Sequence, residues 1–301
     1  MTAKVPRKLL ILDLNGTLLL RSKHTRPARP LSGPGMRTRT VHPRPYLQPL
    51  REYIFHPSTM LWLDTMVWSS AQPHSVADMV NSCFGTQQRK FLAIWARDTL
   101  GIPPALYHQK TQTTKDLRTP WGAFPAHDAR TTLLLDDSVR KAHLHPFNHV
   151  CVEEYLQETR ARDLEVWEAS HSRATPLSAK RLAKNAKKAT SKTKVDVDVK
   201  ESAPPRAATY DETLLAVVGI LETLKTEADV AEWIRGGGLW GDSARPPSPS
   251  PNALAVCMDA LDLAPEPWFS STEAVKYWAA QGVHALEALQ IDVAAGIHGG
   301  H

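Results

Sequence analysis

The sequence predicts an α/β fold, in which helices flank a parallel Rossmann-like sheet and a helical appendage follows at the C-terminal side. Short apolar runs, several of them ending in acidic residues, alternate with helical patterns as far as about residue 157. Beyond residue 209 the patterns are helical. The chain has 301 residues, 42% hydrophobic and 22% charged, so it can bury a core and is not fibrous or wholly disordered.

Four apolar runs are predicted as strands, at residues 8–13, 61–68, 131–136 and 149–152. Short, continuous apolar runs are typical of strands that are buried on both faces of a parallel sheet. The first run ends in Asp13 and the third in Asp136. Since ligands bind at the carboxyl ends of such strands, these two acids are the first candidates for a site.

Three helices are predicted between these strands. Residues 45–55 place Leu47, Leu50 and Ile54 at helical spacing, and Pro45 suits a first turn. Residues 75–84 and 91–100 are the other two, and Gly101 ends the last of them. Residues 21–44 are rich in Pro, Gly and Arg, and are predicted to form a loop.

The C-terminal side is predicted to hold two helices that begin at capping boxes. Thr209 and Glu212 form the first box, before a helix that stops at Gly236. Ser270 and Glu273 form the second, before a helix that ends near Leu289. We therefore expect a first domain at residues 1–157, a basic flexible linker at 170–208, and a helical region at 209–292 with a Pro-rich joint at 241–252.

The net charge of +5 is mild, but the basic residues are concentrated in two stretches without acids, 21–51 and 177–194. In the first stretch, the loop at residues 21–44 is either an electrostatic funnel for acidic ligands or a solvated loop. The second is a nuclear import signal, a nucleic-acid contact or a solvated linker. We expect a nuclear or otherwise cytoplasmic protein, for which nucleic acid is a possible partner.

The number of cysteines and the length of the apolar runs exclude disulfide-rich, four-cysteine zinc and membrane-spanning proteins. Three cysteines occur, which is too few for a disulfide framework or a four-cysteine zinc site and favours a reducing compartment. The apolar runs are far shorter than the ~20 residues needed to span a membrane, and we expect neither a signal peptide nor a membrane partner.

The polar residues that follow the predicted strands suit phosphoryl transfer. Asp13, Ser69 and Asp136 each end or follow a strand, and Lys115 lies between the second and third of them. A carboxylate can attack phosphorus, so that one difficult step becomes two easier ones. A cation and hydrogen-bond donors must then neutralise the charge of the transferred group.

Four motifs in order carry a resemblance to a known family. They are residues 13–18 (DLNGTL), 67–71 (VWSSA), 115–117 (KDL) and 134–138 (LLDDS), the last followed by 145–148 (HPFN). Over about residues 6–157 the chain resembles the haloacid dehalogenase superfamily. Within it, the chain is similar to the NLI-interacting-factor-like phosphatases, which act on the RNA polymerase II C-terminal domain. The resemblance implies a haloacid dehalogenase-type phosphatase domain. Only about 26 residues separate the first motif from the first predicted helix, so we expect no large cap. An open cleft without a cap favours phosphorylated proteins or peptides over small metabolites.

The resemblance also implies roles for individual residues. Asp13 would be the catalytic nucleophile that forms an aspartyl-phosphate. Thr17, Ser69 and Lys115 would bind the phosphate. Asn15 occupies the second catalytic position.

A Mg²⁺ ion is the cofactor that the resemblance implies. Asp13 and Asp136 would ligate it, the backbone carbonyl of Asn15 would contribute, and Asp137 would lie beside it, where the family often has Asn. Mg²⁺ prefers such oxygen ligands.

Asn15 departs from the family, which has an aspartate there to protonate the leaving group and then to activate water. An amide cannot move that proton, so a factor of roughly 10²–10⁴ in rate is at stake. The sequence therefore leaves three functions open. The first is a Mg-dependent Ser/Thr phosphoprotein phosphatase, and the second is a pseudophosphatase that binds phosphorylated partners or scaffolds nuclear interactions without turnover. The third is nucleic-acid binding through the basic stretches.

Overall fold

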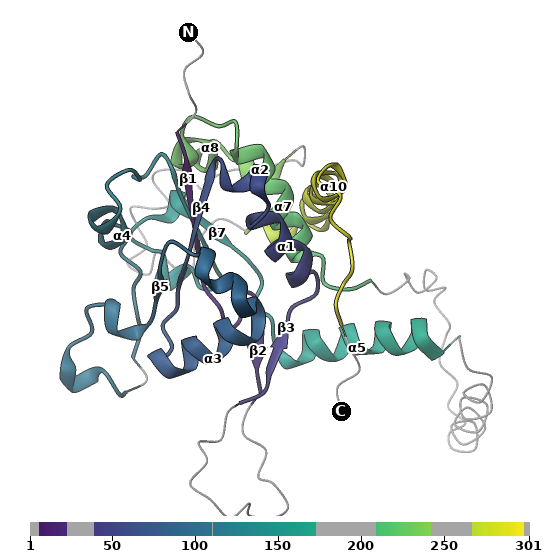
Figure 1. Ribbon diagram of the computed structural model, residues 1–301, viewed down its shortest axis with the longest axis horizontal. Helices are drawn as coiled ribbons and strands as arrows, with labels where there is room; N and C mark the ends of the chain where they lie inside the picture. The colour runs from purple at the N-terminus through teal and green to yellow at the C-terminus, as the bar shows by residue number, and fades with distance from the viewer. Residues whose placement is uncertain (1–5, 23–38, 110, 173–208, 242–266, 298–301) are drawn as a thin grey trace, which may run out of the picture.

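The computed structural model describes residues 6–22, 39–109, 111–172, 209–241 and 267–297. Its central feature is a five-stranded sheet in which every neighbouring pair is parallel (Figure 1). The strand order is β5-β4-β1-β6-β7, which confirms the predicted α/β class. The strands are β1 (Lys8–Leu12), β4 (Leu63–Trp68), β5 (Ile94–Trp95), β6 (Thr132–Asp136) and β7 (His149–Cys151).

Alternate residues of β1 face two apolar layers, because successive side chains of a strand point to opposite faces. Leu10 and Leu12 pack in the larger cluster, together with residues of the first, third and C-terminal helices. Leu9 and Ile11 face a smaller cluster bordered by Trp121. The helices before β7 are α1 (Leu47–Ile54), α2 (Pro57–Met60), α3 (Pro73–Phe84) and α4 (Arg118–Ala123).

Short 3₁₀ turns make up many of the connections. Before β6 they are η1 (Gly85–Lys90), η2 (Arg97–Thr99) and η3 (Pro104–Leu106), and between β6 and β7 they are η4 (Val139–Lys141) and η5 (Pro146–Asn148). The C-terminal part adds η6 (Gly238–Trp240) and η7 (Trp268–Ser270). The turn η4 follows β6 directly, which places it at the edge of the sheet where the two predicted acids lie.

The helix predicted at residues 91–100 is wrong. Ile94 and Trp95 instead form the edge strand β5, paired with Val67 and Trp68 of β4. Backbone N–H groups of Val67 and Ser69 donate to carbonyls of this segment. Pairing with the open edge of β4 thus outweighs the local helical spacing.

The loop predicted at residues 21–44 is also only partly right. Strands β2 (Leu19–Arg21) and β3 (Val41–Pro43) pair antiparallel. Residues 23–38, which join them, lie outside the described residues, as do most of the linker, the Pro-rich joint and the second basic stretch. The interpretations of those segments stay predictions.

The C-terminal helices begin differently from the prediction. The first, α7 (Thr213–Leu224), starts after the predicted box, and Asp211 rather than Thr209 accepts a hydrogen bond from the N–H of Thr213. It ends at Leu224, and the separate helix α8 (Val230–Arg235) begins with Asp229 as its N-cap. The helices of this part are α5 (Gln157–Ser172), α7, α8 and α10 (Thr272–Ala288).

The second capping box is shifted by one residue. Ser271, not Ser270, is the N-cap of α10, and its Oγ accepts a hydrogen bond from the N–H of Ala274. Two adjacent serines offer the same cap chemistry, so the local pattern cannot choose between them. None of the helices in the described ranges is long and apolar enough to cross a membrane.

Helices α7 and α10 pack side by side with their backbones in close contact (Figure 1). A Cβ added to Gly219 would overlap the carbonyl oxygen of Trp278, and one added to Gly282 would overlap that of Leu215. The two glycines therefore set the distance between the helices. Residues 214–221 of α7 are all buried, so this helix belongs to the same apolar cluster as the sheet.

Candidate active site

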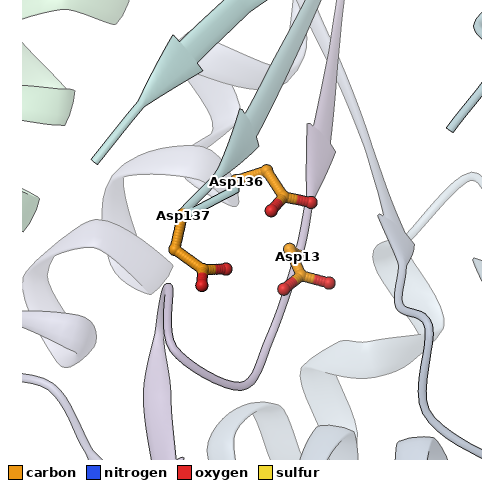
Figure 2. A group of neighbouring side chains, drawn as sticks. All are labelled: Asp13, Asp136 and Asp137. Atoms are coloured by element: carbon orange, nitrogen blue, oxygen red, sulfur yellow. The ribbon is translucent and has the colours of Figure 1, made fainter. Parts of the chain in front are cut away.

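Three carboxylates converge at the carboxyl edge of the sheet (Figure 2). Asp13 follows β1, Asp136 ends β6, and Asp137 comes next in the chain. Because β1 and β6 are parallel neighbours, their carboxyl ends meet there. One oxygen of each side chain lies within 4.8 Å of the others. Asp13 and Asp136 are almost fully buried, and Asp137 is half-buried.

The loop after Asp13 is held tightly against Asp137. Gly16 has a φ of 90°, and a Cβ there would lie 2.8 Å from Oδ2 of Asp137, so glycine is needed both for the turn and for the close approach. The Thr17 hydroxyl donates to Oδ1 of Asp137 and accepts from its backbone N–H, at 3.1 and 3.0 Å. Thr17 therefore fixes the position of Asp137.

Lys115 bridges the two buried carboxylates. Its Nζ lies 2.9 Å from Oδ1 of Asp13 and 2.6 Å from Oδ2 of Asp136, and its side chain is fully buried. A buried lysine that bonds to two carboxylates holds both of them in place. The structure thus brings Lys115 to the carboxylates that the sequence placed at the strand ends.

Lys141 is a site residue that the sequence analysis missed. Its Nζ lies 3.2 Å from Oδ2 of Asp13, 3.0 Å from Oδ1 of Asp136 and 3.5 Å from Oδ1 of Asp137. The backbone N–H of Lys115 donates to the carbonyl of Lys141 at 2.8 Å, which joins the two lysine-bearing loops. The sequence pattern that could have indicated Lys141 is the basic pair Arg140 and Lys141, which follows the acidic motif closely.

The buried charges shift each other's ionisation. Burial opposes charge on Asp136, but Lys115 and Lys141 outweigh it and hold the pKa of that carboxyl well below its usual range. Burial raises the pKa of Asp137 to about 6, against the opposing effect of Lys141 and with the help of the charge on Asp13. The three carboxylates outweigh burial at Lys141 and raise the pKa of its ammonium.

Three predicted site residues have other partners. The hydroxyl of Thr17, which was predicted to bind phosphate, bonds to Asp137. The other two residues are Ser69 and Asn15. Ser69 lies at the end of β4, the other neighbour of β1, and its Oγ accepts a hydrogen bond from the N–H of Ala71 at 3.4 Å. Asn15 lies in the loop after Asp13 with an exposed side chain, whose Oδ1 accepts from the N–H of Arg21 at 2.9 Å. Both therefore lie at the site edge, but bond to backbone groups beside it.

Arg44 links this loop to the C-terminal helices. Its guanidinium is buried, and it donates to the carbonyls of Thr17 and Glu153 at 3.0 and 2.9 Å. It also donates to the carboxylate of Asp211 at 2.7 Å and to the hydroxyl of Thr213 at 3.0 Å. One side chain thus joins the loop after the candidate nucleophile to the start of α7.

The donor set of the three carboxylates suits a hard divalent cation. Mg²⁺ binds carboxylate oxygens, and three of them converge at this edge. The same edge also carries two ammonium groups, which can neutralise phosphate oxygens.

Comparison with known proteins gives one family and a few relatives. A profile of the NLI interacting factor-like phosphatase family matches residues 8–171, from β1 into α5. An uncharacterized FCP1 homology domain-containing protein of Schizosaccharomyces pombe is 33% identical over 173 residues. The match covers 53% of this chain and 67% of that protein.

Two solved structures of RNA polymerase II CTD phosphatases are also similar. Fission yeast Fcp1 bound to beryllium fluoride aligns with a TM-score of 0.35 and 16% identity, over 50% of this chain and 42% of that one. A second Fcp1 structure, described as an essential phosphatase of this type, aligns with a TM-score of 0.44 and 14% identity. That alignment covers 94% of this chain and 93% of the other.

Proposed function

The chain belongs to the NLI interacting factor-like phosphatase family, and from this premise we propose that it takes the phosphoryl group of phosphorylated Ser/Thr proteins onto Asp13. The observation that supports this most is the buried Asp13 carboxylate, which Lys115 joins to Asp136 at the sheet edge. A carboxylate so held is pre-oriented for attack on phosphorus.

Each residue has a proposed part in the reaction. An oxygen of Asp13 attacks phosphorus, the bond to the serine or threonine oxygen breaks, and an aspartyl-phosphate forms. The leaving oxygen takes its proton from solvent water. Lys115 neutralises one phosphoryl oxygen, and Ser69 donates to another. Thr17 keeps Asp137 in place. Water then attacks the aspartyl-phosphate and releases inorganic phosphate.

The divalent cation belongs to the same proposal. Asp13, Asp136 and Asp137 would hold it, with the backbone carbonyl of Asn15. When bound, Mg²⁺ would offset the negative charge of the phosphoryl oxygens.

Asn15 limits the proposed turnover. Its amide can neither protonate the leaving alkoxide nor accept a proton from the attacking water, so both steps lose general acid–base help worth roughly 10²–10⁴ in rate. Its side-chain oxygen is engaged by the N–H of Arg21. We therefore propose a slow phosphatase.

The second candidate is a pseudophosphatase, which would bind phosphorylated partners without turnover. The specific observation in its favour is Asn15 itself, since the remaining groups bind phosphate without needing to move a proton. The two candidates share the binding step and differ only in whether the phosphoryl group leaves the protein.

Hydrolysis of Ser/Thr phosphopeptides in Mg²⁺ tests the proposal, with the full chain, Asn15→Asp and Asp13→Ala compared. Slow release of phosphate by the full chain, above that of Asp13→Ala and abolished by a chelator, supports the phosphatase. Release by Asn15→Asp alone, with phosphopeptide bound by the full chain, supports the pseudophosphatase. If Asp13→Ala equals the full chain and Asn15→Asp in both binding and release, neither function stands.

A further inference from the structure

The ammonium of Lys141 lies where three carboxylates meet. It is within 3.5 Å of one oxygen each from Asp13, Asp136 and Asp137. The same three side chains are the group that could hold a metal ion among the described residues. A positively charged side chain of this protein therefore lies among the donors of the proposed cation site.

We propose that Lys141 is a built-in cation that keeps this site closed, and that a divalent cation enters only when the Lys141 side chain has left. The inference rests on the proposed function, because it assumes that the three carboxylates bind a metal. It adds a residue of this chain that controls that binding.

The two cations compete for the same oxygens. Mg²⁺ binds oxygens at about 2.0–2.1 Å, with near-octahedral geometry. The ammonium holds the same carboxylates at 3.0–3.5 Å in charge-assisted contacts. A metal ion drawn in to its own distance would lie next to Nζ of Lys141, and two cations in contact repel strongly in a buried site.

Lys141 can leave the site, whereas Lys115 cannot. The Lys141 side chain is 15% exposed, and Lys115 is 0% exposed. Lys141 belongs to turn η4, and its backbone carbonyl stays bonded to the N–H of Lys115 when its side chain rotates. The long, flexible stem of a lysine can reach solvent without a change of backbone.

Charge balance explains why a built-in cation is useful here. Three carboxylates packed together repel one another, and Lys115 alone does not compensate them. Lys141 supplies a further positive charge, which lets the edge of the sheet fold without a metal ion. A divalent cation that replaces it would compensate the carboxylates more fully.

The same movement changes the partners of the proposed nucleophile. Lys115 contacts Oδ1 of Asp13, and Lys141 contacts Oδ2. Departure of Lys141 would leave room for a divalent cation at Oδ2, while Lys115 keeps Oδ1 in place. Each carboxylate oxygen accepts more than one contact, so an oxygen that is bound in this way can still face a phosphoryl group.

A binding measurement tests this inference without relying on activity. Mn²⁺, used as the probe, is titrated into the full chain, Lys141→Met and Arg140→Met, and free Mn²⁺ is followed by electron paramagnetic resonance. Arg140 is the exposed neighbour in the same turn, so its variant loses one positive charge but not the contact. Lys141→Met should bind at least about tenfold more tightly than the full chain, because no charge-assisted contacts are broken first. Arg140→Met should bind like the full chain.

A second measurement uses the unmodified chain, in case Lys141→Met folds poorly. The side-chain nitrogens of labelled lysines are observed by NMR, with the Lys141 signal assigned from Lys141→Arg. Mg²⁺ should abolish the hydrogen-bonded signal of Lys141 and leave that of Lys115.

The outcomes separate this inference from the proposed metal site. Equal Mn²⁺ affinity in the full chain and Lys141→Met, or an equal gain in Arg140→Met, overturns the role of Lys141 and leaves the metal site standing. If the hydrogen-bonded signal of Lys141 persists in saturating Mg²⁺, the role of Lys141 is likewise overturned and the metal site stands. Absence of Mn²⁺ binding in a folded Lys141→Met overturns both the inference and the proposed metal dependence.

Discussion

The carboxyl edge of the sheet and the α7–α10 helix pair are both buried, but the first is built from charged side chains and the second from glycines and apolar side chains. At the edge, charged side chains from three separate loops contact one another, as in the bridge from Asp13 through Lys115 to Asp136. In the helix pair, glycines and apolar side chains let two backbones touch. Buried ion pairs add little net stability compared with apolar packing. The edge thus holds the groups of the proposed chemistry, while the helix pair stabilises the fold.

Removal of the candidate nucleophile should change activity more than any other substitution. Asp13→Ala should reduce phosphatase activity to the uncatalysed background, because the nucleophile is removed. Thermal unfolding should show that the variant remains folded, since the α7–α10 pair is intact. Activity equal to that of the unmodified chain would contradict the assignment.

Arg44 lies between the two regions, so its removal should affect both. Arg44→Met leaves the Asp211 carboxylate without its buried partner, and we expect a loss of about 3–5 kcal/mol in the free energy of unfolding. Loss of the contact to the Thr17 carbonyl should also lower phosphate affinity. Denaturant unfolding and phosphopeptide binding measure the two effects. Lower stability with unchanged binding would show that the two regions are independent.

The helix pair is tested by adding a single methyl group. Gly282→Ala would raise the stability of an exposed helix, but here the new Cβ meets the carbonyl of Leu215. We expect a loss of about 1–3 kcal/mol from this overpacking. Activity per folded molecule should not change. If urea unfolding shows that Gly282→Ala is more stable than the unmodified chain, the backbones of α7 and α10 are not in close contact.

Substitution in an exposed ion pair should change the free energy of unfolding least. Arg130 and Asp128 are in contact at 3.0 Å, but their side chains are 70% and 48% exposed. Arg130→Gln should change the free energy of unfolding by less than about 1 kcal/mol, because solvent screens such pairs. A loss as large as that of Arg44→Met would mean that burial is not what distinguishes the two pairs.

Strand ends were the most predictable part of the molecule. Asp13 and Asp136 end continuous apolar runs, and the parallel sheet brings such ends to one edge. Lys115 was predicted as a site residue from the motif at residues 115–117. In the structure its Nζ lies between these two carboxylates. The fold class followed from the same alternation of strands and helices.

Features that depend on distant contacts were not predictable. Lys141 belongs to a basic pair that follows the acidic motif, but this pattern does not predict its contacts with three carboxylates. Asp136 and Asp137 precede it by only a few residues, and Asp13 lies far away in the chain. The strand at Ile94 and Trp95 exists because β4 offers an open edge. Helix α7 begins after Asp211, whose carboxylate bonds to Arg44 and accepts a hydrogen bond from the N–H of Thr213. In each case a tertiary contact overrides the local signal.

We propose that Asp13 accepts a phosphoryl group although Asn15 cannot transfer a proton. Trapping that group tests it most directly. The unmodified chain and Asn15→Asp are incubated with acetyl phosphate and Mg²⁺, quenched, digested and examined by mass spectrometry. Acetate leaves without being protonated, so Asp13 should be phosphorylated in the unmodified chain. The adduct should persist there and be lost faster in Asn15→Asp, where water can be activated. A phosphoryl group absent from Asp13 in both proteins would contradict the claim.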